Sequence, residues 1–328
     1  MSSCRPRQSF ETAEDRRKTW EAGRREDGEN KIGRGVQGRR QKLFRADANR
    51  VAAAVRCFGS PHFGLRQEET EVEAGKVYFV GAGPGAEDLL TLRGAALLEE
   101  ADVVVYAGSL VNPALLKRCK PEAEIYDSAR LDLNEVLDIL IPAAKAGKRV
   151  VRLHTGDPSV YGAHREQMDA LKAAAVPFEV CPGVSSFFGA AASLGAEYTL
   201  PGVSQTVILT RAAGRTPVPE KERLSALAAH GASLVLFLSA GRAAEAVEEL
   251  LRGGYYTTET PAAIVYKATW PDERILRTTL GELAKDAEAA GITKTALLLI
   301  GDFLGAEYEN SKLYDPSFTT EFREGKQA

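Results

Sequence analysis

The sequence predicts an α/β protein with two domains, each built on a mainly parallel β-sheet. From Lys76 onward, short runs of β-branched residues alternate with amphipathic stretches rich in Ala, Leu and Glu, which is typical of strand–helix–strand units. The 328 residues are 44% hydrophobic and 27% charged, so the chain can bury the cores of two ordinary domains. Leu200-Pro201-Gly202 interrupts the alternation, and we expect the boundary near residues 198–204.

The elements follow from these runs in chain order. The first domain, residues 76–200, should contain strands at 77–80, 103–106, 124–126, 150–153 and 178–180. Helices are expected between them at 89–100, 134–146, 165–174 and 184–194. The second domain, residues 201–310, should contain strands at 206–210, 233–238, 262–266 and 296–300, with helices at 221–229, 243–252 and 280–289.

The two ends of the chain fall outside this pattern. Residues 1–75 carry charge clusters such as Asp15-Arg16-Arg17-Lys18 and almost no apolar periodicity, so we expect a disordered N-terminal extension and assign it no function. Residues 311–328 form a C-terminal tail.

Bulk composition excludes several classes of function. The 42 Lys and Arg residues nearly balance 45 Asp and Glu residues, giving a net charge of −3, so no basic field favours nucleic acid as a partner. No apolar run approaches the roughly 18 residues of a membrane span, and no signal-peptide core is present, which indicates a cytoplasmic protein with no membrane partner. The cysteines, Cys4, Cys57, Cys119 and Cys181, form no C-x-x-C pair, so we expect neither a metal site nor a disulfide framework.

The first chemical motif is Gly81-Ala82-Gly83-Pro84-Gly85-Ala86, between a predicted strand and a predicted helix. Its glycines would let backbone amides approach a ligand. The run also matches the loose dinucleotide-binding pattern G-x-G-x-x-G/A. Two features disfavour that alternative: Pro84 removes an N–H from the loop, and Asp102 precedes the second strand instead of ending it.

Two further motifs make the pattern specific. His154-Thr155-Gly156-Asp157-Pro158-Ser159-Val160-Tyr161-Gly162 and Cys181-Pro182-Gly183-Val184-Ser185-Ser186 each follow a predicted strand. Together with residues 81–85 they resemble the tetrapyrrole-methylase superfamily, whose members bind S-adenosylmethionine in a cleft between two α/β domains. Parallel strands place their C-terminal loops at one edge of a sheet, so the three loops should converge on one cleft.

Within the superfamily the chain most resembles the precorrin-4 and cobalt-precorrin-4 C11-methyltransferases, over residues 76–323. The stretches that carry this resemblance are 106–113, 126–129, 204–211, 214–220, 267–273 and 311–315. Uroporphyrinogen methyltransferases share the first loop and Gly156-Asp157-Pro158. They typically carry an acidic residue just after the second strand, where this chain has Ala107-Gly108, which favours the C11 group.

The resemblance implies a cofactor site for S-adenosylmethionine, with S-adenosylhomocysteine as product. The implied contacts are Pro84, Thr155, Gly156, Asp157, Val160, Ser185, Ser186, Leu238, Lys267, Ala268, Thr295 and Ala296. Asp157 has two interpretations, a contact with a cofactor hydroxyl or amine and the turn structure that an Asp before Pro favours. Ser185 and Ser186 at a helix start likewise suit either capping or cofactor contact.

The implied substrate is a tetrapyrrole with several carboxylates, which arginine forks bind well. The candidates are Arg130, Arg211 and Arg215, in family-like loops after strands. A sulfonium is already an activated methyl donor, so the protein mainly has to position the reactants and exclude water.

No general base is assigned. The side chains of His154, His164, Tyr106, Asp127 and Tyr161 suit packing or capping as well as proton transfer.

Several alternatives remain open. The substrate could be uroporphyrinogen III or another precorrin, and a tetrapyrrole-binding module without catalysis is the alternative from outside enzymology. Whether the substrate carries cobalt is not decided by the sequence, because the metal would belong to the substrate. The resemblance also implies a homodimer.

Overall fold

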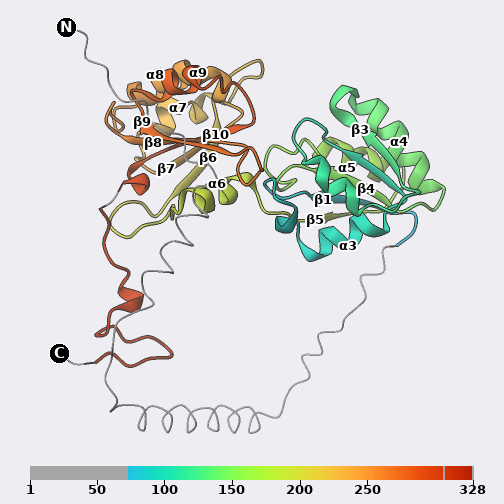
Figure 1. Ribbon diagram of the computed structural model, residues 1–328, viewed down its shortest axis with the longest axis horizontal. Helices are drawn as coiled ribbons and strands as arrows, with labels where there is room; N and C mark the ends of the chain where they lie inside the picture. The colour runs from blue at the N-terminus through green and yellow to red at the C-terminus, as the bar shows by residue number, and fades with distance from the viewer. Residues whose placement is uncertain (1–72, 306, 327–328) are drawn as a thin grey trace, which may run out of the picture. The chain divides into compact units, whose positions relative to one another are not determined.

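The computed structural model describes residues 73–305 and 307–326 (Figure 1). The expected disordered extension therefore lies almost wholly outside the described residues. Within them, no helix is both long and apolar enough to cross a membrane.

The first sheet consists of five parallel strands in the order β3-β2-β4-β1-β5. Their bounds are Val77–Gly81 (β1), Val103–Tyr106 (β2), Glu124–Asp127 (β3), Val150–His154 (β4) and Phe178–Cys181 (β5). The expected strands are confirmed to within a residue, because buried parallel strands appear in the sequence as short continuous apolar runs.

Helices cover both faces of this sheet. Along β1, Val77 and Phe79 pack into the cluster that contains α4 (Leu133–Lys145) and α5 (Arg165–Ala173). Tyr78 and Val80 point to the opposite face and pack with α3 (Leu92–Glu100). Alternate residues thus serve opposite cores, as the two-residue period of a strand requires. The arrangement is a doubly wound sheet.

Local signals set the helix starts. The Asp132 side chain accepts from the backbone N–H of Glu135, and the Glu135 side chain accepts from that of Asp132, a complete capping box for α4. Thr91 caps α3 by accepting from the backbone N–H of Gly94 at 3.1 Å.

The second sheet has the order β6-β7-β10-β8-β9. Its strands are Val207–Arg211 (β6), Ser233–Phe237 (β7), Pro261–Tyr266 (β8), Arg274–Thr279 (β9) and Ala296–Ile300 (β10). Only β6 and β7 pair in parallel, and the other three pairs are antiparallel. The expected α/β class is confirmed, but this sheet is mixed where mainly parallel strands were expected.

The missed strand β9 explains part of that difference. A short turn without a helix joins β8 to β9, and Tyr266 pairs with Arg274, so the chain returns antiparallel. No strand was expected at 274–279 because its Arg and Thr residues break the apolar pattern.

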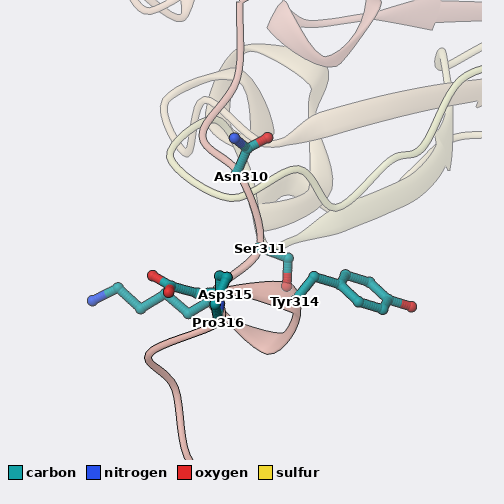
Figure 2. Close-up of a pocket in the computed structure, with 6 residues that line it drawn as sticks. Asn310, Ser311, Tyr314, Asp315 and Pro316 are labelled. Carbon is teal, nitrogen blue, oxygen red and sulfur yellow. The ribbon is translucent and has the colours of Figure 1, made fainter. Parts of the chain in front are cut away.

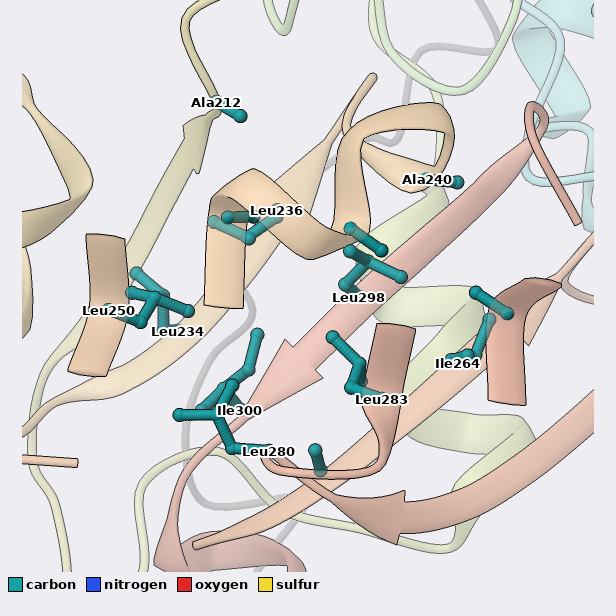
Figure 3. Close-up of a cluster of buried hydrophobic side chains, with 14 of the residues drawn as sticks. Ala212, Leu234, Leu236, Ala240, Leu250, Ile264, Leu280, Leu283, Leu298 and Ile300 are labelled. Atoms are coloured by element: carbon teal, nitrogen blue, oxygen red, sulfur yellow. The ribbon is translucent and has the colours of Figure 1, made fainter. Parts of the chain in front are cut away.

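The second sheet is also covered on both faces. The helices α7 (Leu224–Ala228), α8 (Ala243–Arg252) and α9 (Leu283–Ala289) pack on one face, where Leu234, Leu298 and Ile300 form a core (Figures 1 and 3). The other face packs against α6 (Ser186–Leu194). This helix precedes the predicted boundary at 198–204, yet its apolar side packs against the second sheet. The predicted domain limits stay a prediction.

The tail is organised by its own hydrogen bonds. Beyond Ala306, the guanidinium of Arg323 donates to the carbonyl oxygens of Leu313, Asp315 and Phe318. Almost every residue of 307–326 is exposed, so this segment adds little to either core.

Candidate functional site

Two loops pair at the C-terminal edge of the first sheet. The backbone N–H of Gly156, after β4, donates to the carbonyl of Gly83, after β1, at 2.9 Å, and the reverse bond is 3.2 Å. The chain leaves the neighbouring strands β1 and β4 in opposite directions, toward β2 and β5. Such a topological switch point is where open α/β sheets usually bind ligands.

A third loop, after β5, packs directly against these two. A Cβ atom added to Gly183 would lie 2.3 Å from the carbonyl oxygen of Gly156 and 2.7 Å from the Cα of Gly81. Backbone therefore meets backbone at this point, and no side chain fits between the three loops. The predicted convergence of the three motifs is observed.

The carboxylate of Asp157 fixes this arrangement. One oxygen accepts from the backbone N–H of Ser159 at 2.9 Å and also from its hydroxyl, and the other accepts from the N–H of Gly183 at 2.7 Å. Burial raises the pKa of Asp157, but these hydrogen bonds outweigh it and hold the pKa below its usual value. The bonds support the turn interpretation of Asp157, and its contact with a cofactor remains a prediction.

The second sheet supplies the opposite wall. In the turn between β8 and β9, the indole of Trp270 donates to the carbonyl of Pro84 at 3.1 Å. The neighbouring Thr269 hydroxyl accepts from the N–H of Ala86 at 3.0 Å. From the first-sheet side, the Asn112 amide donates to the carbonyl of Gly85 at 2.9 Å. The loop 82–86 is thus clamped from both sides.

These walls enclose a cavity of about 410 Å³. All twelve residues predicted to bind the cofactor line it: Pro84, Thr155, Gly156, Asp157, Val160, Ser185, Ser186, Leu238, Lys267, Ala268, Thr295 and Ala296. The volume lies within the range of about 300–1,000 Å³ that is common for small-molecule sites. The structure thus brings the whole predicted set together.

Several hydroxyl groups in this cavity have no protein partner. Among the described residues, no hydrogen bond is made by the side chains of Ser109, Thr155, Ser185, Ser186, Thr293 and Thr295. Ser185 is only 5% exposed and occupies the N-cap of α6, but its side chain makes no capping bond. The capping interpretation of Ser185 is therefore wrong. The hydroxyl lines the cavity without a described partner, so it is available to a ligand.

The backbone of the cavity wall is unusual. Left-handed φ angles occur at four non-glycine lining residues, at Tyr161 (57°), Leu238 (52°), Lys267 (49°) and Thr295 (56°). Such conformations cost free energy and concentrate at functional sites. Of the other non-glycine residues with positive φ in the described ranges, only Ala175 lies outside the loops that form this cavity.

The three arginines predicted for the substrate do not line the cavity. The guanidinium of Arg211 donates to the carbonyls of Ala212, Thr216 and Pro217, which makes it a brace for the loop after β6. Arg130 is exposed at the end of a short 3-10 helix, Ser128–Arg130, and Arg215 is exposed on a loop. Neither makes a hydrogen bond or ion pair with a described residue. Their contact with substrate stays a prediction.

The two histidines lie behind the cavity wall. His154 is buried at the end of β4, and its ring lies 6.0 Å from that of His164 and 5.9 Å from that of Phe79. Its Nε2 atom has no hydrogen-bond partner among the described residues. Burial, with smaller effects of Arg152 and His164, lowers the pKa of His154 to about 3. Neither histidine lines the cavity, which supports the packing interpretation over proton transfer.

The sequence did not assign the remaining lining residues. They are Ser109, Leu110, Tyr161, Phe237, Ala240, Val265, Trp270, Thr293, Lys294 and Leu297. Trp270 and Ser109 lie in stretches that carried the family resemblance, so that signal could have identified them. Lys294 lies in no such stretch.

A second hollow lies on the tail (Figure 2). All six of its lining residues are exposed and come from one short segment, 310–316. It lacks the converging elements that a ligand site needs, and we assign it no role.

The fold and the cavity define a class of two-sheet α/β proteins that bind a small ligand at the switch point of a doubly wound sheet. The order β3-β2-β4-β1-β5 separates β1 from β2, unlike the dinucleotide-binding fold, so that alternative is wrong. The chain belongs to the tetrapyrrole (corrin/porphyrin) methylases, whose family model matches residues 76–284.

Individual relatives narrow the comparison. The chain is 52% identical over 249 residues to the cobalt-precorrin-4 C(11)-methyltransferase of Methanocaldococcus jannaschii, covering 76% of this chain and 96% of the relative. It is 47% identical over 240 residues to the precorrin-4 C(11)-methyltransferase of Rhodococcus erythropolis, covering 73% of this chain and 96% of the relative.

Solved structures place the chain in the same family. The crystal structure of a cobalt precorrin-4 methyltransferase of cobalamin biosynthesis matches with a TM-score of 0.69 and 48% identity, covering 71% of this chain and 97% of that one. The uroporphyrin-III C-methyltransferase of Thermus thermophilus, solved with S-adenosyl homocysteine, matches with a TM-score of 0.58 and 31% identity, covering 70% and 93%.

Proposed function

We propose that this protein transfers a methyl group from S-adenosylmethionine to C11 of precorrin-4 or cobalt-precorrin-4 in cobalamin biosynthesis. One observation carries the proposal: the chain is 52% identical to a C11 enzyme over 96% of that enzyme's length. The family model matches residues 76–284, which include the three loops at the switch point. The lower identity of 31% to the uroporphyrin-III enzyme makes that substrate the second choice.

The cavity fits the cofactor. It combines apolar walls, such as Leu238 and Ala296, with hydroxyls that no described residue satisfies, such as those of Ser185 and Thr295. A nucleoside joined to an amino acid needs both kinds of surface. S-adenosylmethionine would supply an electrophilic methyl group on a sulfonium.

The residues of this chain would hold the reactants and exclude water. The clamp made by Trp270 and Asn112 on the loop 82–86 fixes one wall of the cavity, so the reacting groups need less reorganisation. In the described residues, no group of three His, Cys, Asp or Glu side chains could hold a metal ion. Cobalt is therefore treated as part of the substrate.

The test is methyl transfer with defined substrates. The purified protein is incubated with isotopically labelled S-adenosylmethionine and precorrin-4, cobalt-precorrin-4 or uroporphyrinogen III, and products are identified by mass spectrometry and NMR. One labelled methyl group at C11 supports the proposal, and the preferred substrate decides the cobalt question. Methylation of uroporphyrinogen III alone would make that compound the substrate in place of precorrin-4. Tight tetrapyrrole binding without turnover would indicate a binding module.

We also propose that the protein is a cytoplasmic homodimer. The support is the resemblance to the family and the absence of a membrane-spanning helix from the described residues. Light scattering coupled to size-exclusion chromatography would measure the mass, and a monomer at micromolar concentration would contradict the dimer.

A further inference from the structure

Tyr161 stands in a strained turn. Its φ of 57° is left-handed, and so is that of Ala163, at 47°. For a bulky aromatic residue this conformation is a true outlier. Between them, a Cβ on Gly162 would lie 2.1 Å from the carbonyl oxygen of Pro158, so the turn admits no side chain at this position.

The strain directs the ring across the cavity. Tyr161 lines the cavity, and its ring centroid lies 5.3 Å from that of Phe237 at the end of β7. Phe237 in turn pairs with Arg211 at the end of β6. A residue from a first-sheet loop therefore meets the second sheet beside the loop that Arg211 braces.

The phenol is available to a ligand. It makes no hydrogen bond to any described residue, and the side chain is 45% exposed. Burial raises the pKa of Tyr161, with a smaller opposing effect of Arg211 and a smaller reinforcing effect of Glu222. The hydroxyl is thus protonated at neutral pH and able to donate.

Tyr161 lies at the second-sheet side of the cavity, because its ring packs against that of Phe237. The charges that act on its hydroxyl are on Arg211, at the end of β6, and on Glu222, in the segment that follows, and neither residue lines the cavity. Pro84 and Thr155, two of the residues proposed for the cofactor, belong to the loops after the first-sheet strands. The half-exposed Tyr161 is open to a methyl acceptor that reaches the cavity from outside.

We propose that Tyr161 contacts the tetrapyrrole and determines how it is oriented, with the ring against the macrocycle and the hydroxyl donating to a polar group of the substrate. This inference rests on the proposed function and names a substrate contact that the family resemblance did not supply. A side chain that only filled space would not require a half-exposed aromatic residue in a left-handed conformation.

Two substitutions separate contact from packing. Tyr161→Phe keeps the ring and removes only the hydroxyl, so it should raise the KM for the tetrapyrrole about five- to fiftyfold and leave the Kd for S-adenosylmethionine within about twofold. Tyr161→Gly relieves the backbone strain and removes the ring, so kcat/KM should fall further. Glycine tolerates the left-handed conformation at no steric cost.

Ala175→Gly is the matched control. Ala175 has a φ of 55° at the end of α5 and lies outside the cavity. Ala175→Gly should change the Tm as Tyr161→Gly does, because both substitutions relieve a left-handed backbone. It should leave the KM for the tetrapyrrole and the KM for S-adenosylmethionine at their wild-type values.

The outcomes are distinct. If wild-type protein methylates the tetrapyrrole and Tyr161→Phe leaves its KM unchanged, the inference is wrong whatever the stability of Tyr161→Gly. If Tyr161→Phe weakens the cofactor as much as the tetrapyrrole, Tyr161 belongs to the cofactor site and the inference is also wrong. If wild-type protein methylates none of the tetrapyrroles, the proposed function itself fails.

Discussion

The indole Nε1 of Trp270 donates a hydrogen bond to the carbonyl oxygen of Pro84 at 3.1 Å, joining the turn after β8 to the glycine loop after β1. A Cβ on Gly85 would lie 2.0 Å from Trp270 Cδ1, so the ring rests directly on this backbone. The ammonium of Lys267 lies 4.9 Å from the indole centroid and pairs with Asp272 at 2.6 Å. The clamp thus links both sheets at the cavity.

Trp270→Phe should weaken S-adenosylmethionine binding. The variant keeps an aromatic ring but loses the bond to Pro84, so the loop 82–86 should be held less firmly, and we expect about a three- to tenfold rise in Kd by calorimetry. Trp20 and Trp270 are the only tryptophans. In a Trp20→Phe background, the emission of Trp270 should change when cofactor is added. If the Kd for S-adenosylmethionine is unchanged in Trp270→Phe and the emission of Trp270 does not change on cofactor addition, the clamp plays no part in binding.

Gly156→Val should abolish cofactor binding while the protein remains folded. Gly156 has a φ of 59°, and an added Cβ would lie 3.4 Å from the backbone nitrogen of Ser186 inside the cavity wall. A branched side chain there would fill space that the ligand needs. Calorimetry measures the binding, and circular dichroism measures the fold.

Gly147→Val provides the control for backbone strain. Gly147 has a φ of 78° and no heavy atom within 4 Å of an added Cβ, far from the cavity lining. Both variants should lose stability through the left-handed backbone, but only Gly156→Val should lose the cofactor. Equal losses of binding would mean that strain alone explains the result.

The sequence predicted the fold best where burial dominates. The strand β10, Ala296–Ile300, is buried throughout, and its apolar run shows in the sequence. The strand β9 was missed because its arginines find specific partners instead of solvent. Arg277 donates to the carbonyl of Leu194, and Arg274 lies over the ring of Tyr266. Such contacts depend on tertiary structure, which a periodic pattern does not contain.

The candidate site also depends in part on tertiary contacts that a sequence pattern does not contain. Glycine loops after strands identified one cavity, because backbone conformation restricts the residue type at each position. Arg211 was predicted to bind substrate, yet its guanidinium donates to the carbonyls of Thr216 and Pro217. A sequence displays side chains that could bind a carboxylate, but it does not display the backbone acceptors that compete for them.

Arg215→Ala should raise the KM for the tetrapyrrole about tenfold and leave cofactor affinity nearly intact. Arg215 is exposed in the loop that Arg211 braces. A lost charge-assisted hydrogen bond of about 1.5–3 kcal/mol accounts for at least this effect. Added salt should weaken substrate capture more in the wild type than in the variant. If steady-state kinetics at two ionic strengths are the same for both proteins, Arg215 is a surface residue.

His154 should make the folded state sensitive to acid. Burial lowers the pKa of His154 to about 3, below its ordinary value of 6.5, and within the described part of the chain its Nε2 has no hydrogen-bond partner. The unfolded chain therefore takes up a proton below about pH 6.5 that the folded chain does not. The stability that neutral His154 contributes is intact above pH 6.5 and declines as the pH falls toward 3, by up to about 1.4 kcal/mol per pH unit.

Replacing this imidazole should flatten the pH dependence. His154→Phe keeps a ring beside Phe79 and removes the titration, so the free energy of unfolding should fall less between pH 6.5 and 5 than in the wild type, by about 2 kcal/mol at most. Urea unfolding at several pH values measures the difference. His230→Gln, at an exposed position, is the control and should follow the wild type. His164 and Arg152 remain in both proteins, so an identical slope for wild type and His154→Phe would assign the acid sensitivity to groups other than His154.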